Sequence, residues 1–186
     1  IRCMATAKDY LYGTLFEDNY LIRSLNNCII TQPDVALTEL VANAWDAGAT
    51  EVKIFIPEKR GQVLSIEDNG IGLTKEEFYS RWMKLSYNRL LHQGKKVLFP
   101  NGKTSSRIAY GRNGVGRHGL LCFNDEYQVI TRKAGVELSL TVSTKIAGQA
   151  IAVIDEQTTS SKNQGTILKV VVERNLPTVN QIREII

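Results

Sequence analysis

Hydrophobic residues change their spacing several times along this chain, and each change predicts a new element. From residue 31 to about residue 47 they recur at helical intervals, after a capping signal in Thr31-Gln-Pro33-Asp34, and Gly48 can end that helix. Apolar and polar positions then alternate at 51–57 and 63–67, which predicts two strands joined by a tight turn. The first part of the chain therefore predicts a helix followed by a hairpin.

The rest of the chain predicts a helix, a long loop and several strands. Thr74-Lys-Glu-Glu77 is a capping box that opens a helix to about residue 85. Periodicity fades from Ser86 to Tyr110, and a loop of that length in a compact domain is usually functional, so we interpret it as a lid. After the lid, a glycine-rich run opens a short apolar helix. The last predicted elements are four strands and a helix, at 126–132, 136–143, 150–155, 166–173 and 178–186. This order predicts an α+β layered sandwich and not a βαβ alternation.

Composition places the chain among intracellular globular proteins. Its 186 residues are 43% hydrophobic and 23% charged, which suits a single domain with its own core. Cys3, Cys28 and Cys122 are too widely spaced for a disulfide framework or a metal-binding pair, so we expect reduced thiols. There is no apolar run of membrane-spanning length and no signal-peptide pattern. We expect a cytoplasmic protein, with a nuclear location open in a eukaryote, and no membrane partner.

The ends of the chain suggest a piece of a longer protein. It opens at Ile1 and closes within a predicted helix, so we expect residues 1–186 to be one N-terminal domain of that protein.

The positive charge of the chain is concentrated in one segment. The net charge is +4, yet residues 78–124 contain no acidic side chain and nine basic ones: Arg81, Lys84, Arg89, Lys95, Lys96, Lys103, Arg107, Arg112 and Arg117. Outside this segment 14 basic residues stand against 19 acidic ones, so the whole excess lies within it. Phosphate groups or nucleic acid are the partners that such a segment favours.

Two polar motifs carry the candidate chemistry. Glu39, Asn43, Asp46 and Ala47 have the spacing of one helix face, and 21 residues after Ala47 comes Asp68, at the end of a predicted strand. A carboxylate and a carboxamide one helical turn apart suit a water activator beside a magnesium ligand. A side chain at a strand end commonly reaches a ligand from a rigid scaffold.

A third motif is rich in glycine. In Gly111-x-x-Gly114-x-Gly116 at a helix start, the absence of Cβ atoms lets backbone N–H groups approach an anion. A loop without a ligand is the alternative, but its place in the acid-free segment favours a phosphate cradle. Gly114–Gly119 also matches GxGxxG, and Gly102-Lys103-Thr104 resembles the end of a P-loop. No strand leads into either one, which excludes both readings.

Together these motifs resemble a known set. ExxxNxxDA at Glu39–Ala47, DNGIG at Asp68–Gly72, GxxGxG at Gly111–Gly116 and Gly165-Thr166 are similar, in order, to the four nucleotide-binding boxes of the GHKL superfamily. This superfamily comprises gyrase-type topoisomerases, ninety-kilodalton heat-shock chaperones, sensor histidine kinases and MutL-type mismatch-repair ATPases. The motif details look closest to the chaperone, MutL-like and MORC-like branches.

The resemblance implies a Bergerat fold with an ATP site. That fold is a two-layer α/β sandwich whose mixed, mainly antiparallel sheet is covered on one face by helices and a long lid, here about 86–118. It implies that Asp68 accepts the adenine amino group, that Gly70 and Gly72 let the base approach, and that Thr166 supports the same contact. The residues that it implies around ATP are Asn43, Asp46, Ala47, Asp68, Gly70, Ile71, Gly72, Leu73, Ser86, Gly111, Arg112, Asn113, Gly114, Val115, Gly116, Arg117, His118, Gly119 and Thr166.

The resemblance also assigns roles on the first helix. Asn43 is expected to bind Mg²⁺ together with phosphate oxygens and waters. Glu39 is expected to be the catalytic base, because hydrolases of the superfamily use this glutamate to deprotonate water, whereas its kinases generally lack it. A solvated helix carboxylate is the alternative for Glu39. Asp46 is expected to support Asn43, and Trp45 to pack in the core.

The expected function is Mg-dependent ATP binding and slow hydrolysis that switches downstream domains, with an ATP-dependent homodimer and a DNA or protein client as partners. Related hydrolases take a phosphate-contacting lysine from the following domain, so this fragment alone is expected to hydrolyse weakly. One alternative is a nucleotide-stabilised module that binds DNA through residues 78–124. Phosphotransfer to a histidine is disfavoured by Glu39. The fold alone does not decide between these biological roles.

Overall fold

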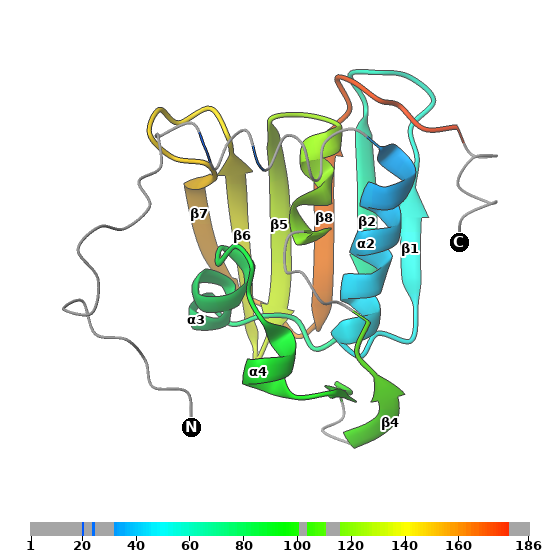
Figure 1. Ribbon diagram of the computed structural model, residues 1–186, viewed down its shortest axis with the longest axis vertical. Helices are drawn as coiled ribbons and strands as arrows, with labels where there is room; N and C mark the ends of the chain where they lie inside the picture. The colour runs from blue at the N-terminus through cyan, green and yellow to red at the C-terminus, as the bar shows by residue number, and fades with distance from the viewer. Residues whose placement is uncertain (1–19, 21–23, 25–31, 101–103, 111–115, 179–186) are drawn as a thin grey trace, which may run out of the picture.

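A single antiparallel sheet forms one layer of the protein, and the helices lie on one of its faces (Figure 1). The computed structural model describes residues 20, 24, 32–100, 104–110 and 116–178. Six strands in the order β1-β2-β8-β5-β6-β7 make up the sheet, and every neighbouring pair is antiparallel. Their bounds are Val52–Phe55 (β1), Val63–Asp68 (β2), Glu126–Lys133 (β5), Val136–Ser143 (β6), Ala152–Ser160 (β7) and Gly165–Val171 (β8). The predicted α+β sandwich and the predicted β1–β2 hairpin are confirmed.

Helix α2, Pro33–Asp46, is the first predicted helix. Proline stands in its first turn, as expected, but the N-cap is Gln32, which makes no side-chain capping bond. The proposed capping residue Thr31 lies outside the described residues. The helix ends just before Gly48, whose φ of +74° favours glycine. Its buried side is formed by alanine and leucine at helical spacing: Ala36, Leu37, Leu40 and Ala44.

The core lies between the sheet and these helices. Strand positions that alternate toward the helices, such as Leu64, Val129 and Leu140, are fully buried. They pack in one cluster with α2 and with the 3₁₀ helix η2, Gly116–Cys122, which supplies Leu120. Burial of these apolar side chains holds the two layers together. The polar residues Asn43 and Asp46 of α2 line one pocket with Asp68 at the end of β2.

The second predicted helix is shorter than expected. Thr74 and Glu77 form the predicted capping box around α3, Lys75–Glu77. The chain then widens into a π-helical turn, η1, Phe78–Trp82, and does not continue to residue 85. The rings of Phe78 and Trp82 stack with centroids 6.1 Å apart, and both are buried, so the turn is fixed by core packing.

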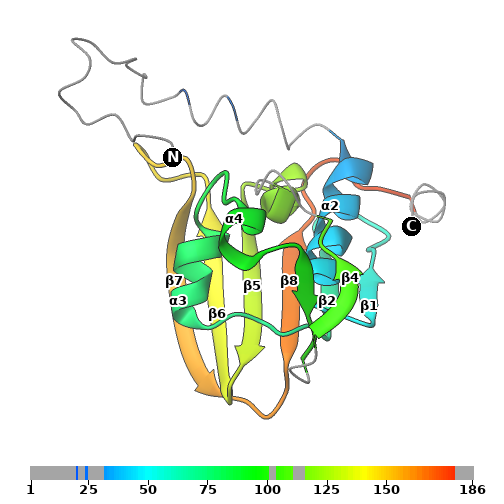
Figure 2. The same cartoon turned by 60° about the horizontal axis from the view of Figure 1, so that its bottom comes forward.

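The predicted loop at 86–110 is wrong as a description of secondary structure. The segment contains a short helix, α4, Arg89–Gln93, and a two-stranded hairpin of β3, Lys96–Leu98, and β4, Thr104–Ile108. Side-chain capping explains α4, because Asn88 Oδ1 accepts the Leu91 N–H at 3.0 Å. Figure 2 shows β4 in front of the β2 region, next to α2. We call residues 86–110 the lid.

The later strands agree with prediction apart from their ends. β7 extends to Ser160 instead of 155, and β8 ends at Val171 instead of 173. The predicted last helix lies outside the described residues except for Thr178. Within the described part of the chain, no helix is both long enough and apolar enough to span a membrane.

Candidate functional site

A pocket lies where α2, the ends of β2 and β8, and the lid come together. Its walls are largely apolar, with Leu40, Ile66 and Leu168 among them. Three arginines also line it: Arg81, Arg89 and Arg117. Of the predicted contact residues in the described part of the chain, the pocket is lined by Asn43, Asp46, Ala47, Asp68, Ile71, Gly72, Leu73, Arg117 and Thr166.

Asp68 is the acidic group that the sheet contributes to the pocket. It is the last residue of β2 and stands opposite Thr166 of β8. Burial raises its pKa from 3.8 to about 6, against the lowering effect of backbone hydrogen bonds at Gly70 and Thr166, and nearby Glu67 raises the pKa further. The Gly70 N–H donates to Asp68 Oδ1 at 2.8 Å. A partly buried carboxylate of this kind favours a ligand that donates a hydrogen bond.

The glycines after Asp68 are required by the protein's own packing. A Cβ on Gly70 would meet Ala47 and the Asp68 carboxylate at 2.8 Å. Gly72 has a φ of +62°, and a Cβ there would overlap the carbonyl of Arg132. Neighbouring protein atoms therefore already require glycine at both positions, and a role of these glycines in the approach of a base stays a prediction. Gly72 still lines the pocket.

Two hydrogen bonds fix the loop that follows Asp68. The Ile71 N–H donates to the Ala47 carbonyl at 2.8 Å, which joins the loop to the end of α2. The Leu73 N–H donates to Thr131 Oγ1 at 2.7 Å. Thr131 is fully buried on β5, beside Thr166 in the register, and sequence reasoning missed it. The sequence feature that could have identified Thr131 is a polar residue at a core-facing position of a strand with alternating burial.

Asn43 is the amide on the polar face of α2. It lines the pocket, and its buried Nδ2 atom has no hydrogen-bond partner among the described residues. An unpartnered buried amide nitrogen is costly unless a ligand satisfies it. Because rotation exchanges the oxygen and nitrogen ends of an amide, Asn43 can offer either one to a ligand.

Glu39 lies one turn earlier on α2 and touches the start of η2. Gly116 packs so closely on Glu39 that a Cβ there would overlap the Glu39 carboxylate. Gly119 is similarly close to the Ala36 carbonyl, at 2.9 Å for an added Cβ. Glycine at both positions therefore lets η2 approach α2. The remaining predicted cradle residues, Gly111, Arg112, Asn113, Gly114 and Val115, lie outside the described residues.

Arg117 and His118 follow Gly116 and point to different places. The Arg117 guanidinium lines the pocket, donates to the Arg81 carbonyl and lies 5.5 Å from the centroid of the Tyr87 ring. Burial lowers its pKa. His118 was predicted to contact ATP, but its side chain is fully buried in the core. Only its backbone remains to serve a ligand.

A hydrogen-bonded chain accounts for the position of His118. Trp82 Nε1 donates to the Tyr127 hydroxyl at 3.0 Å, and that hydroxyl lies 2.7 Å from His118 Nδ1. The roles of donor and acceptor between the Tyr127 hydroxyl and His118 Nδ1 depend on the tautomer of the histidine ring. Burial, with the charge of Arg117, lowers the His118 pKa from 6.5 to about 3, so the ring is neutral.

Asp46 binds the lid and does not support Asn43 as predicted. Its Oδ1 accepts the Tyr110 N–H at 2.7 Å, and its Oδ2 lies 3.7 Å from Arg89 Nε. Since the only side-chain donor of Asn43 is unpartnered, no side-chain hydrogen bond joins the two residues. The Arg89 guanidinium also donates to the Asp46 carbonyl at 3.1 Å.

The prediction that Trp45 packs in the core is wrong, because its side chain is 46% exposed. Trp45 instead contacts Arg107 and Ile108 of the lid. Its Nε1 donates to the Ile108 carbonyl at 3.1 Å. The Arg107 guanidinium lies 3.9 Å from the Trp45 ring centroid and donates to the Ala49 carbonyl at 2.7 Å. The last turn of α2 therefore carries pocket residues on one side and the lid on the other.

Ser86 is the remaining predicted contact residue, and it does not line the pocket. It is exposed and has a φ of +55° at the turn that begins the lid. The next residue, Tyr87, is buried and lines the pocket together with Arg89. The lid thus contributes to the pocket through residues that were not among the predicted contact residues.

Comparison with known proteins agrees with this geometry. A family model described as "Histidine kinase-, DNA gyrase B-, and HSP90-like ATPase" matches residues 30–174. Chaperone protein HtpG of Geobacter sulfurreducens is 27% identical over 161 residues, which cover 75% of this chain and 24% of the chaperone. HtpG of Hydrogenovibrio crunogenus is 27% identical over 172 residues, 81% of this chain and 26% of that protein.

A repair protein is also similar to the chain. DNA mismatch repair protein MutL of Neorickettsia sennetsu is 30% identical over 112 residues, 55% of this chain and 16% of that protein. The chain spans about a quarter or less of the length of these relatives. The family match includes α2, the β2 end, the lid, η2 and β8, the elements that build the pocket. The predicted resemblance is confirmed, and the chain belongs to the family of histidine kinase-, DNA gyrase B- and HSP90-like ATPases.

Proposed function

We propose that this chain binds Mg·ATP in the pocket and hydrolyses it slowly to ADP and phosphate. The observation that carries the proposal is the pairing of a partly buried carboxylate, Asp68, with an unpartnered amide, Asn43, in one largely apolar pocket. The carboxylate suits a base that donates a hydrogen bond. The amide suits a polar group or cation farther out.

Asp68 would recognise the adenine. Its pKa of about 6 keeps the carboxylate mostly ionised at neutral pH, so that it accepts the exocyclic amino group. Leu40, Ile66 and Leu168 offer apolar surface to the ring. Thr166, opposite Asp68 in the sheet, would support the same contact.

Asn43 would hold the magnesium ion. No group of three His, Cys, Asp or Glu side chains in the described ranges could bind a metal by itself. An ion at Asn43 would therefore depend on phosphate oxygens and water as well, as Mg²⁺ commonly does. When bound, Mg²⁺ would neutralise charge on the phosphates. Arg117 is the cation that η2 brings to the pocket for the same purpose.

Glu39 would act on the attacking water. Its carboxylate lies against Gly116, at the described end of the predicted phosphate cradle. From this position it would orient the water and accept its proton. The presence of this carboxylate disfavours phosphotransfer to a histidine as the main activity.

The lid would make the nucleotide a conformational signal. Asn43 and Asp46 are on the same helix face, and Asp46 binds Tyr110 and Arg89 of the lid. A ligand at Asn43 therefore acts next to the lid contacts, so that it would favour one lid position. We propose that this drives ATP-dependent homodimerisation and downstream domains, with a protein client as for a chaperone or DNA as for a repair protein.

The test separates binding from hydrolysis in the full-length protein. Glu39→Ala should leave ATP affinity within about threefold of wild type while turnover falls by about a hundredfold or more, the scale expected for loss of a general base. Glu58→Ala, at an exposed turn position distant in sequence from the site, is the control. Unchanged turnover in Glu39→Ala would refute the assignment of the base.

A second candidate is a nucleotide-stabilised module that binds DNA. Lys84, Lys95 and Lys96 are exposed and form no ion pair with any residue that the structure describes, so they are available to phosphates. Arg81, Arg89 and Arg107 are instead engaged within the fold. Salt-dependent DNA binding that triple Lys→Gln substitution removes would support this candidate. Competition between ATP and DNA for the same cations would count against it.

A further inference from the structure

Helix η2 is bonded at its carboxyl end by the segment that follows β8. Arg174 Nη2 donates to the Leu121 carbonyl at 2.7 Å, and Arg174 Nε donates to the Cys122 carbonyl at 3.2 Å. Asn175 Nδ2 donates to the same Cys122 carbonyl at 2.8 Å. These are the last carbonyls of η2, which lack partners within the helix. We call Arg174 and Asn175 the clasp.

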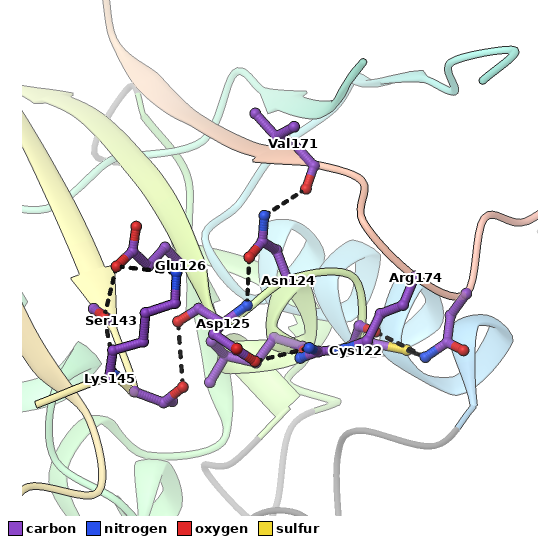
Figure 3. Close-up of polar contacts among 11 residues, drawn as sticks. Cys122, Asn124, Asp125, Glu126, Ser143, Lys145, Val171 and Arg174 are labelled. Atoms are coloured by element: carbon purple, nitrogen blue, oxygen red, sulfur yellow. Dashed lines mark hydrogen bonds and ion pairs between the residues drawn. The ribbon is translucent and has the colours of Figure 1, made fainter. Parts of the chain in front are cut away.

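The clasp is also bonded to the turn that joins η2 to β5. Arg174 Nη1 lies 2.8 Å from Asp125 Oδ1, and the backbone N–H of Arg174 donates to the Phe123 carbonyl at 3.1 Å. Asn124 accepts the Asp125 N–H at 2.7 Å and donates to the Val171 carbonyl of β8 at 2.9 Å. Figure 3 shows these contacts between the end of η2 and the strand region. The guanidinium is therefore held from several directions.

These hydrogen bonds are important for the orientation of η2, because most of its other contacts are apolar and constrain its direction less. Leu120 and Leu121 are buried in the core, and apolar burial does not set the orientation of a helix closely. Toward α2, η2 presents Gly116 and Gly119, which have no side chains to interlock. Among the described residues, one other side-chain hydrogen bond links η2 to the sheet, and it joins His118 to Tyr127 of β5.

We propose that Arg174 and Asn175 are positioning residues for the phosphate half of the site. By fixing η2 at its carboxyl end, they keep Gly116 against Glu39 and Arg117 in the pocket wall. This inference rests on the proposed ATPase function. The base half of the site, Asp68 with Thr166, is built on β2 and β8, and no hydrogen bond or ion pair among the described residues joins it to the clasp. Loss of the clasp should therefore affect the phosphates and not the adenine.

The test compares adenosine with Mg·ATP in the full-length protein. Arg174→Met removes the donors but keeps the length of the side chain, and Arg174→Lys restores the charge with fewer donors. Lys145→Met is the matched control, because Lys145 belongs to the same polar region in Figure 3 but pairs with Glu126, at 3.6 Å, and not with η2. Calorimetry gives the Kd for each ligand, and phosphate release gives kcat.

Arg174→Met should raise the Kd for Mg·ATP about tenfold and lower kcat at least as much, with the Kd for adenosine within twofold of wild type. Arg174→Lys should lie between, and Lys145→Met should match wild type. If Arg174→Met does not fold, Asn175→Gly serves instead. It removes one donor, suits the φ of +54° at this position and should shift the ATP values in the same direction by a smaller factor.

Two results would overturn the inference while leaving the proposed function intact. One is an equal loss of affinity for adenosine and ATP, which indicates general destabilisation. The other is wild-type affinity and kcat in the clasp variants. Failure of the wild-type protein to bind ATP would overturn the proposed function, and the inference with it.

Discussion

The Glu39 carboxylate on α2 lies directly against the Cα atom of Gly116 on η2, so closely that no side chain fits between them. The two residues come from separate sequence motifs, 77 positions apart in the chain. Their contact joins the proposed water-activating group to the described end of the glycine-rich segment. It is the clearest structural reason for glycine at position 116.

Gly116→Ala should therefore impair the site itself. The added Cβ overlaps Glu39, so η2 or the carboxylate must move, at a cost of about 1–3 kcal/mol in the free energy of unfolding. ATP turnover should fall at least tenfold in a steady-state assay. Gly148→Ala is the control, because Gly148 has a φ of +76° with open space around it, so that its substitution introduces backbone strain without overlap. Equal activity in the two variants would contradict the account.

Two titratable groups, the partly buried Asp68 and the buried His118, should give opposite pH dependences of stability. The raised pKa of Asp68, from 3.8 to about 6, favours the folded state below about pH 4, and this contribution is lost as the pH rises through about 6. The lowered pKa of His118, from 6.5 to about 3, favours the folded state above about pH 6.5, and this contribution is lost as the pH falls toward 3. Between pH 4 and 6 the two effects partly cancel.

Asp68→Asn should expose the histidine contribution. The variant should lose stability more steeply than wild type as the pH falls from 6 to 4, with a difference of up to about 3 kcal/mol over the whole titration of Asp68. Urea denaturation at several pH values measures it. Asp155→Asn, which changes an exposed carboxylate, should follow the wild-type curve. Parallel curves for Asp68→Asn and wild type would show that the Asp68 pKa is not raised.

The contact between Arg107 and Trp45 should govern lid opening. Arg107→Lys keeps the charge but loses the planar group that lies over the Trp45 ring and donates to the Ala49 carbonyl, at a cost of about 0.5–2 kcal/mol. Backbone hydrogen exchange at 96–100 and 104–110 should accelerate. Nucleotide release should also accelerate, because Tyr87 and Arg89 of the lid line the pocket.

Lys95→Gln provides the comparison for that experiment, since Lys95 is an exposed lid cation outside this contact. Its exchange rates should match those of wild type. Equal protection in Arg107→Lys and wild type would mean that the lid is held by other contacts, with the Arg89–Asp46 pair as the first alternative.

Sequence alone located the parts of the site that depend on local periodicity. Asn43 follows Glu39 by one helical turn, and Asp68 ends a strand whose alternation is clear, so their elements and faces could be predicted. The order of the elements indicated an α+β sandwich, whereas the mainly antiparallel sheet was implied by the family resemblance. The glycine at 116 was found through its motif, although its reason, contact with Glu39, required the structure.

The missed features depend on partners that are distant in the sequence. Trp45 looked like a core residue because nothing near it indicated Arg107, 62 positions later, as its partner. Asp46 was assigned to its neighbour Asn43, whereas its described partners are in the lid. The lid hairpin shows weak periodicity because its strands are short. In β3, Val97 is fully buried between two exposed residues, which is too short a pattern to predict a strand. Tertiary contacts of this kind override local patterns.

The most direct test of the central claim is calorimetric titration of ATP into wild type, Asp68→Asn and Asn43→Ala, with and without Mg²⁺. The account predicts saturable binding by wild type that Mg²⁺ strengthens. Asp68→Asn should lose at least tenfold in affinity in either condition, because the base contact fails. Asn43→Ala should lose only the Mg²⁺-dependent gain. Absence of saturable binding by wild type, or wild-type affinity in Asp68→Asn, would contradict the claim that this pocket recognises ATP.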